Sequence, residues 1–115
     1  MLIKKSQRKR QQLAREAFVY EYCGVGKELG MAVAELNGRV PDAGTMKNKI
    51  CHEAYYVMSG SAQVFIGNEV VDIGEGDVLQ IQPGQEYYVE ASNLRLIAPT
   101  APAFYPEQWE NIKTL

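Results

Sequence analysis

The stretch KNKICHEAYYVMSG, residues 47–60, constrains the fold of this chain more than any other segment. Its residues alternate with a period of two, which is the pattern of a β-strand whose successive side chains point to opposite faces. One face carries Lys47, Lys49, Cys51, Glu53, Tyr55 and Val57. If this face is turned into a barrel, two ammonium groups, a thiol and a carboxylate share one cavity.

Short β-type runs separated by turn residues fill the chain from residue 18 onward. They are FVYEYC (18–23), MAVAELN (31–37), AQVFI (62–66), EVVDI (69–73), VLQIQ (78–82), EYYVEA (86–91) and LRLIA (94–98). Together with the stretch above they make roughly eight strands, at the spacing of an all-β sandwich or barrel. Gly67 and Asn68 are typical of a two-residue hairpin turn. No room remains for crossover helices, so a parallel βαβ fold is excluded.

The charge of the chain is unevenly distributed. A chain of 115 residues favours one domain with one core. Residues 1–15 carry six basic and no acidic side chains, whereas the rest carries six basic and fourteen acidic ones. We therefore predict a basic N-terminal arm over residues 1–17 and a single barrel domain over residues 18–115. The arm has no motif that reads nucleic acid, so no nucleic-acid partner is expected.

The sequence gives no sign of a membrane segment or an export signal. No apolar run reaches the ~18 to 20 residues of a membrane span, and the N-terminus lacks the apolar segment of a signal peptide. We expect a cytoplasmic protein without a membrane partner, in which Cys23 and Cys51 stay reduced. The spacing of Cys and His matches no structural zinc site.

Two segments resemble the sequence motifs of the cupin family. EAYYVMSG, from Glu53 to Gly60, is similar to the second half of the first cupin motif, in which an acid precedes a glycine. GDVLQIQPG, from Gly76 to Gly84, is similar to the start of the second motif. The resemblance extends over residues 44–99 and implies a small single-domain (RmlC-like) cupin. The implied fold is an all-β jelly-roll barrel, the double-stranded β-helix, with at most a short C-terminal helix.

The resemblance also implies where a metal would be held. The usual cupin ligands are three histidines and a glutamate, and the corresponding positions here carry Lys47, Lys49, Tyr87 and Glu53. A lysine ammonium has no lone pair to give, and a neutral tyrosine is a poor ligand for divalent metals. We therefore expect a barrel without metal and without cofactor.

His52 is the only histidine of the chain. Strand alternation places it on the face opposite to Glu53, so we expect it to point out of the barrel, to the surface or to an interface. A metal held by Glu53, His52 and Cys51 would require a β-bulge that reverses the alternation. We interpret Cys51 as a small buried residue, and the alternative is a thiol activated by the neighbouring Lys49.

The residues predicted to bind a ligand are Lys47, Lys49, Cys51, Glu53, Tyr55 and Tyr87. The positive surplus suits a small anionic ligand, and the Glu53 carboxylate suits the hydroxyl groups of a polyhydroxylated one. Our first hypothesis is a protein that binds such a ligand without established catalysis. The alternative is a metal-independent sugar isomerase or epimerase that uses Glu53, Tyr87 or a lysine as acid and base.

The C-terminal segment PAFYPEQWENIKTL, residues 102–115, is expected to cross the barrel as a loop. Its aromatic residues Phe104, Tyr105 and Trp109 either cover the mouth of the barrel or belong to an interface. Because small cupins commonly pair, and pairing covers exposed strand edges, we expect a homodimer.

Overall fold

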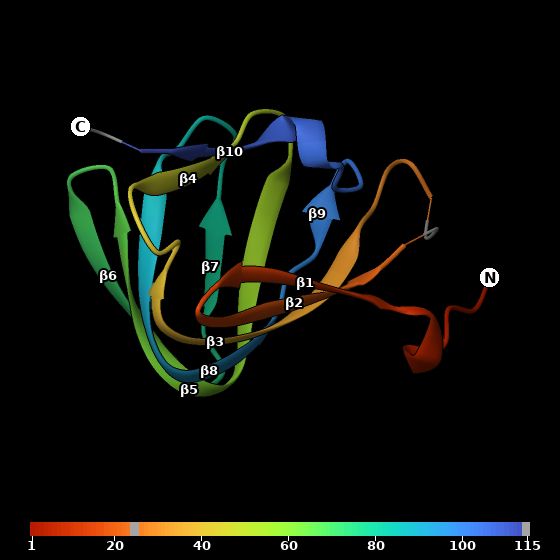
Figure 1. Ribbon diagram of the computed structural model, residues 1–115, viewed down its shortest axis with the longest axis horizontal. Coiled ribbons are helices and arrows are strands. Elements are labelled where there is room, and N and C mark those ends of the chain that lie inside the picture. Colours follow the sequence, from red (N-terminus) through yellow and green to blue (C-terminus); the bar gives the residue numbers. More distant parts are fainter. Residues whose placement is uncertain (24–25, 114–115) are drawn as a thin grey trace.

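The protein is built almost entirely from β-strands (Figure 1). The computed structural model describes residues 1–23 and 26–113. Its strands are β1 (Lys9–Ala14), β2 (Glu16–Tyr22), β3 (Met31–Val40), β4 (Thr45–Asn48), β5 (His52–Ile66), β6 (Glu69–Gly74), β7 (Val78–Ile81), β8 (Tyr87–Ile97), β9 (Thr100–Ala101) and β10 (Trp109–Ile112). Two 3₁₀ turns, η1 (Lys5–Gln7) and η2 (Pro106–Gln108), are the helical elements of this described part. None of its helices is long and apolar enough to cross a membrane.

The strands form one sheet that curls around a central space (Figure 1). Neighbouring strands follow the order β1-β2-β3-β8-β4-β10, and the long β5 pairs with β6, β7, β8 and β9. All these pairings are antiparallel. The all-β class predicted from the sequence is confirmed. The two-residue hairpin turn at Gly67 and Asn68 is also confirmed, because Ile66 pairs directly with Glu69.

The two longest strands, β5 and β8, each join two of the predicted runs. They bend together where Gly60 approaches Asn93, and the register of their pairing shifts twice there, between Val57 and Ser59 and between Ser59 and Ser61. Gly60 and Asn93 both have a positive φ, 79° and 45°. A Cβ on Gly60 would collide with the backbone carbonyl of Asn93, so only glycine allows this approach. The bend also changes which side chains of β5 are buried: these are odd-numbered residues such as Val57 before the bend and even-numbered residues such as Ala62 after it.

The N-terminal hairpin differs from the arm predicted for residues 1–17. β1 pairs with β2, and β2 pairs with β3, so the sheet begins at Lys9 and the predicted boundary falls inside β2. Ala14 and Ala17 are buried in the core. The sequence pattern did not indicate this strand, because Ala14 is the one fully buried residue of β1 and its other side chains, apart from the half-buried Leu13, are polar or charged.

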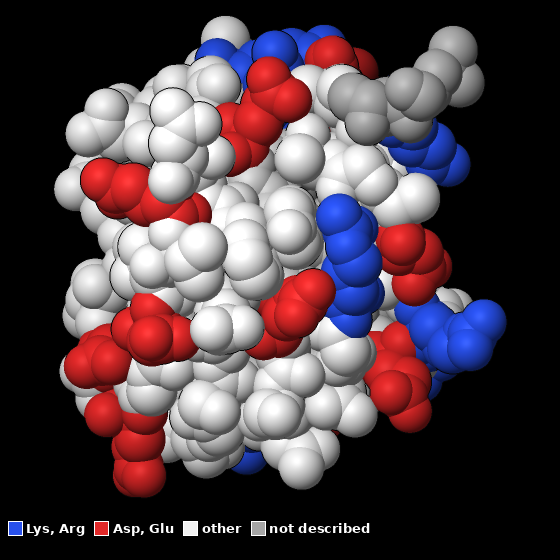
Figure 2. All heavy atoms as spheres, turned by 90° about the vertical axis from the view of Figure 1, so that its left-hand side faces the viewer, with Lys and Arg blue, Asp and Glu red and all other residues white. Residues whose placement is uncertain are grey.

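Basic side chains of the hairpin lie over aromatic rings. The Arg8 guanidinium lies 4.0 Å from the centroid of the Tyr20 ring, and that of Arg10 lies 4.6 Å from the centroid of the Phe18 ring. Such contacts stabilise a partly exposed pair of strands. Figure 2 shows the side of the molecule away from the N-terminus, where acidic groups are scattered over the face and basic groups lie at its top and in its right-hand half.

The chain closes with a strand where a loop was expected. β10 pairs antiparallel with β4, and Trp109 lies opposite Asn48. The short helical element anticipated in this segment is η2. Its last residue, Gln108, is thereby carried to the inner end of β4, sixty positions earlier in the chain.

Candidate functional site

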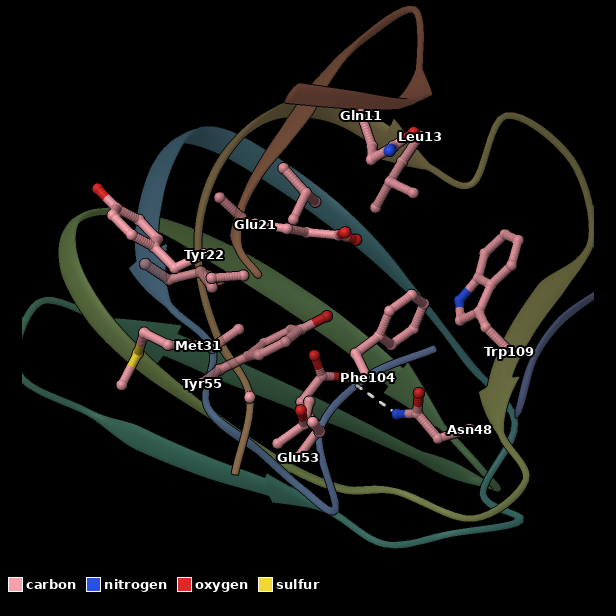
Figure 3. Close-up of a pocket in the computed structure, with 18 of the residues that line it drawn as sticks. Gln11, Leu13, Glu21, Tyr22, Met31, Asn48, Glu53, Tyr55, Phe104 and Trp109 are labelled. Carbon is pink, nitrogen blue, oxygen red and sulfur yellow. Dashed lines mark hydrogen bonds between the residues drawn. The ribbon is translucent and has the colours of Figure 1, made fainter. Parts of the chain in front are cut away.

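A cavity of about 490 Å³ lies inside the barrel (Figure 3). This volume is typical of a site for a small molecule. Apolar side chains from several elements line much of it, among them Leu13, Met31, Phe104 and Trp109. Most of its polar side chains lie on two walls, one formed by β4, β5 and β8 and the other by β1 and β2.

The first wall carries a connected set of polar side chains, which we call the Glu53 cluster: Asn48, Glu53, Tyr55, Tyr87 and Gln108. Asn48 Nδ2 donates a hydrogen bond to Glu53 Oε1 at 3.1 Å, and the Tyr87 hydroxyl donates to the same oxygen at 3.3 Å. The hydroxyls of Tyr55 and Tyr87 are 3.3 Å apart. Glu53 Oε2 has no hydrogen bond to any residue that the structure describes. One carboxylate oxygen is therefore fixed, and the other is available to a ligand.

Gln108 orients the amide of Asn48. Its Nε2 donates to Asn48 Oδ1 at 2.9 Å, which leaves the Asn48 amino group to face Glu53. Its Oε1 accepts the backbone N–H groups of Cys51 at 3.0 Å and Ile50 at 3.3 Å. Both Asn48 and Gln108 are about 1% exposed. Two buried amides thus fix the geometry of the carboxyl group, because buried polar groups lose much stability when left unpaired.

Burial sets the protonation of this cluster. It raises the pKa of Glu53 to about 7, although the hydrogen bonds from Asn48 and Tyr87 act in the opposite direction. Burial also raises the pKa values of Tyr55 and Tyr87, and the nearby Glu53 carboxylate adds to the effect. Both hydroxyls therefore stay protonated at neutral pH. Within the cluster, Glu53 is the group that can gain or lose a proton in that range.

The two lysines of the predicted site lie outside the cavity. β4 ends at Asn48, and residues 49–51 separate it from β5, so the alternation does not run unbroken through the stretch. Met46 and Asn48 are buried and line the cavity, whereas Lys47 takes the opposite phase and Lys49 is exposed. The segment KNKIC, residues 47–51, contains neither Gly nor Pro, so this interruption could not be recognised from turn residues. The structure thus corrects the inward placement of Lys47 and Lys49.

Of the other predicted site residues, Glu53, Tyr55 and Tyr87 line the cavity together, as expected. Cys51 is fully buried beside the cavity and its thiol lies 3.3 Å from the Pro102 carbonyl oxygen, which it can reach as a donor. Burial and the nearby Glu53 raise the pKa of the Cys51 thiol, which does not favour an activated thiolate.

His52 is exposed, which confirms its predicted outward direction. His52 and Glu53 pair with β9 in unbroken register, so no bulge between them turns His52 to the side of Glu53, as a metal site of Glu53, His52 and Cys51 would require. Within residues 1–23 and 26–113, no three His, Cys, Asp or Glu side chains lie close enough to share a metal ion.

The second wall contains a residue that the sequence analysis did not select. Glu21 lines the cavity from β2, together with Gln11 from β1 (Figure 3). Burial raises the pKa of Glu21, while the charge of Lys9 partly opposes this. Strand alternation could have indicated Glu21, because Ala17, Val19 and Glu21 lie on the same face of β2. The structure shows that this face is the inner one, since Ala17 is buried.

The remaining polar residue of note is Thr100 of β9. It pairs with Glu53 across the sheet and lines the cavity. Its hydroxyl oxygen is buried without a hydrogen-bond partner among the described residues. In the C-terminal segment, Phe104 and Trp109 line the cavity, which agrees with the expectation that these aromatic residues lie at the barrel. Tyr105 is exposed.

Comparison with known proteins identifies the fold. No protein-family model and no curated protein matches the sequence. A single-residue variant of Streptomyces Pac13 with uridine matches with a TM-score of 0.86 over 99% of this chain and 92% of its own, at 17% identity, and Pac13 is a nucleoside dehydratase. KdgF from Halomonas matches with a TM-score of 0.73 over 90% of this chain and 96% of its own, at 13% identity.

Oxalate decarboxylase OxdC from Bacillus subtilis is a larger protein with the same kind of domain. It matches with a TM-score of 0.77 over 93% of this chain but 31% of its own length, at 20% identity. At such identities the likeness shows the fold. The chain has the cupin fold, the double-stranded β-helix, as its two motifs predicted.

Proposed function

We propose that this protein binds a small polyhydroxylated molecule in the barrel cavity and transfers protons on it, with Glu53 as acid and base. The observation that carries the proposal is the state of Glu53. Asn48 and Tyr87 hold one of its oxygens, the other has no partner among the described residues, and its pKa is about 7. A group with a pKa near the working pH can both accept and return a proton.

The lining of the cavity supports an uncharged ligand over an anionic one. The lysines that would have attracted an anion lie outside, and no described residue of the lining is Lys, Arg or His. The Glu53 carboxylate and the hydroxyl of Tyr55 can form hydrogen bonds with ligand hydroxyl groups. Phe104 and Trp109 offer flat apolar surfaces suited to a ring. The bound uridine of the similarly folded Pac13 is a ligand of this kind.

The proposed chemistry is proton transfer at a carbon beside a carbonyl group. The Glu53 carboxylate takes that proton, and the electrons of the broken C–H bond form an enolate. The protonated Glu53 then returns the proton to the ligand, which isomerises or epimerises it. If a hydroxyl group is present on the next carbon, the same proton can leave with that hydroxyl as water while a C=C bond forms.

Exchange in heavy water tests this proposal. Carbonyl-bearing sugars and oxidised nucleosides are incubated with the protein, and deuterium uptake and loss of water are followed by mass spectrometry. Glu53→Gln should lower the exchange rate by about 10² to 10⁴-fold, because it keeps the shape but cannot accept the proton. Glu90→Gln, on the exposed side of β8, is the matched control and should exchange normally.

Equal exchange by the wild type and Glu53→Gln would rule out the catalytic role. The second candidate function is that of a binding protein without catalytic turnover. The cavity volume alone is as consistent with such a binding protein as with an enzyme. Ligand binding measured by calorimetry, without any exchange by the wild type, would support that candidate.

A further inference from the structure

The wall of the cavity opposite the Glu53 cluster has its own carboxylate, that of Glu21. Figure 3 shows Glu21 and Gln11 directed into the cavity from the N-terminal hairpin, facing the side on which Tyr55 and Glu53 lie. The Glu21 carboxylate forms no hydrogen bond with another described residue. It is half-buried, beside apolar side chains such as Leu13 and Val19.

Glu21 is not required there by the fold. Ala17 and Val19 precede it on the same face of β2, and an apolar residue would continue that face into the core. An ionisable group in such a place costs stability unless it is hydrogen-bonded. Its register partner, Lys9, is exposed on the neighbouring strand. A ligand that donates a hydrogen bond to Glu21 would offset the cost.

The side chains of this wall indicate what the ligand carries. A carboxylate only accepts hydrogen bonds, whereas the amide of Gln11 can donate as well as accept. An acceptor beside a donor matches the edge of a ring in which an N–H group adjoins a carbonyl group. Phe104 and Trp109 line the cavity beside these two ends, where the faces of such a ring could pack.

The charges of the cavity indicate what the ligand lacks. Glu21 and Glu53 give it two carboxyl groups, and no described lining residue is basic. A phosphate group placed there would meet like charge, and the only cation that acts on Glu21 is the exposed Lys9 outside the described lining. The two walls together therefore suit an uncharged molecule with a hydroxyl-rich part and an N–H-bearing ring.

We propose that Glu21, assisted by Gln11, determines specificity by accepting a hydrogen bond from the ring N–H of an unphosphorylated N-glycoside whose sugar lies at Glu53. This inference rests on the proposed function above and adds the ligand class and a residue role. Glu21 acts in recognition, while the proton transfer belongs to Glu53.

Three matched probes test the assignment by calorimetry: uridine, uridine methylated at its imide nitrogen, and uridine monophosphate. The wild type should bind uridine about 10-fold more tightly than the methylated form, which lacks the N–H donor. Glu21→Leu removes the acceptor and should bring this ratio close to one. Glu21→Gln keeps an acceptor but removes the charge, so it should preserve the ratio and weaken the discrimination against the monophosphate.

Glu35→Gln, an exposed position on the neighbouring strand β3, is the control and should leave all three affinities unchanged. Leucine at a half-buried apolar wall is expected to fold, and thermal melting checks this. Discrimination that persists in Glu21→Leu would overturn the role of Glu21. Failure of the wild type to bind either nucleoside, with deuterium exchange on a carbonyl sugar intact, would overturn the ligand class while leaving the role of Glu53.

Discussion

The two walls of the cavity hold their polar groups in different ways. On the Glu53 wall, five side chains are linked by hydrogen bonds of 2.9 to 3.3 Å, drawn from β4, β5, β8 and the segment before β10. On the Glu21 wall, a carboxylate and a glutamine enter from one hairpin, and the Glu21 carboxylate has no hydrogen-bond partner among the described residues. Hydrogen bonds within the protein hold the polar groups of one wall, and the carboxylate of the other wall is available to a ligand.

This difference fits two tasks. Proton transfer requires a group held in a fixed position with a defined protonation state, so a supporting layer of hydrogen bonds is expected around it. Recognition of a ring edge requires unpaired acceptors and donors that the ligand satisfies. The contrast separates residues whose loss should affect the stability of the protein from residues whose loss should affect the choice of ligand.

The largest expected effect on stability is that of Gln108→Ala. It leaves Asn48 Oδ1 and the backbone N–H groups of Cys51 and Ile50 without their Gln108 partner, while the Asn48 amide still donates to Glu53. We expect a loss of about 2 to 5 kcal/mol in the free energy of unfolding, measured in urea, because each unpaired buried group costs about 1 to 3 kcal/mol. Gln11→Ala, on the opposite wall, is the matched control. A similar loss in both variants would contradict the distinction between the walls.

The next effect is a dependence of stability on pH that Glu53 causes. Its pKa rises from 4.5 in the unfolded chain to about 7 in the fold. Folding therefore favours the protonated group, and stability should fall as pH rises from 4.5 to 7 and then level off. The contribution is about 3 kcal/mol, at 1.36 kcal/mol per pKa unit. Urea unfolding of the wild type and Glu53→Gln at several pH values should show curves that diverge in this window; parallel curves would refute the prediction.

A smaller change of opposite sign is expected at Thr100, which pairs with Glu53 across β9 and β5. Its hydroxyl oxygen is buried without a partner among the described residues. Thr100→Val removes that oxygen while keeping the shape, so it should stabilise the protein by about 1 kcal/mol. Thr45→Val is the control, since the Thr45 hydroxyl donates to Glu86 at 3.0 Å and its removal should bring no gain. A destabilised Thr100→Val would show that the hydroxyl has a partner in solution.

The smallest effect is expected for Lys47→Ala and Lys49→Ala. Both side chains lie outside the cavity, so each change should stay within about 0.5 kcal/mol in stability and leave ligand affinity unchanged. Unfolding in urea and calorimetry with uridine measure the two quantities. A strong loss of affinity in either variant would indicate that the lysine contacts the ligand, and it would weaken the case for an uncharged ligand.

Much of the fold could be predicted because turn residues and alternation are local signals. The Gly67 and Asn68 turn separates two runs of opposite direction, and within β5 the inward Glu53 fixes the outward His52. The strand β1 could not be recognised in the same way. Its buried contribution is small, and it is a strand because β2 offers a pairing edge.

The candidate site was only partly predictable for a related reason. Alternation relates the side-chain directions of residues within one strand. It does not predict these directions across a segment that separates two strands. Residues 49–51 form such a break, and they put Asn48 into the cavity in place of Lys49. The role of Gln108 was hidden too, because its partner Asn48 lies sixty positions away and no local pattern connects them.

The sequence by itself determined the all-β class, the cupin framework from the first to the second motif, and the opposite directions of Glu53 and His52. These depend on turn chemistry and on the period of single strands, which act over a few residues. Only the tertiary structure decided that Asn48, Tyr87 and Gln108 surround Glu53, that the lysines stay outside and that Glu21 faces it. Those relations depend on the pairing of distant strands, and pairing across the sheet sets which groups share the low-polarity interior where a carboxyl pKa can rise to about 7.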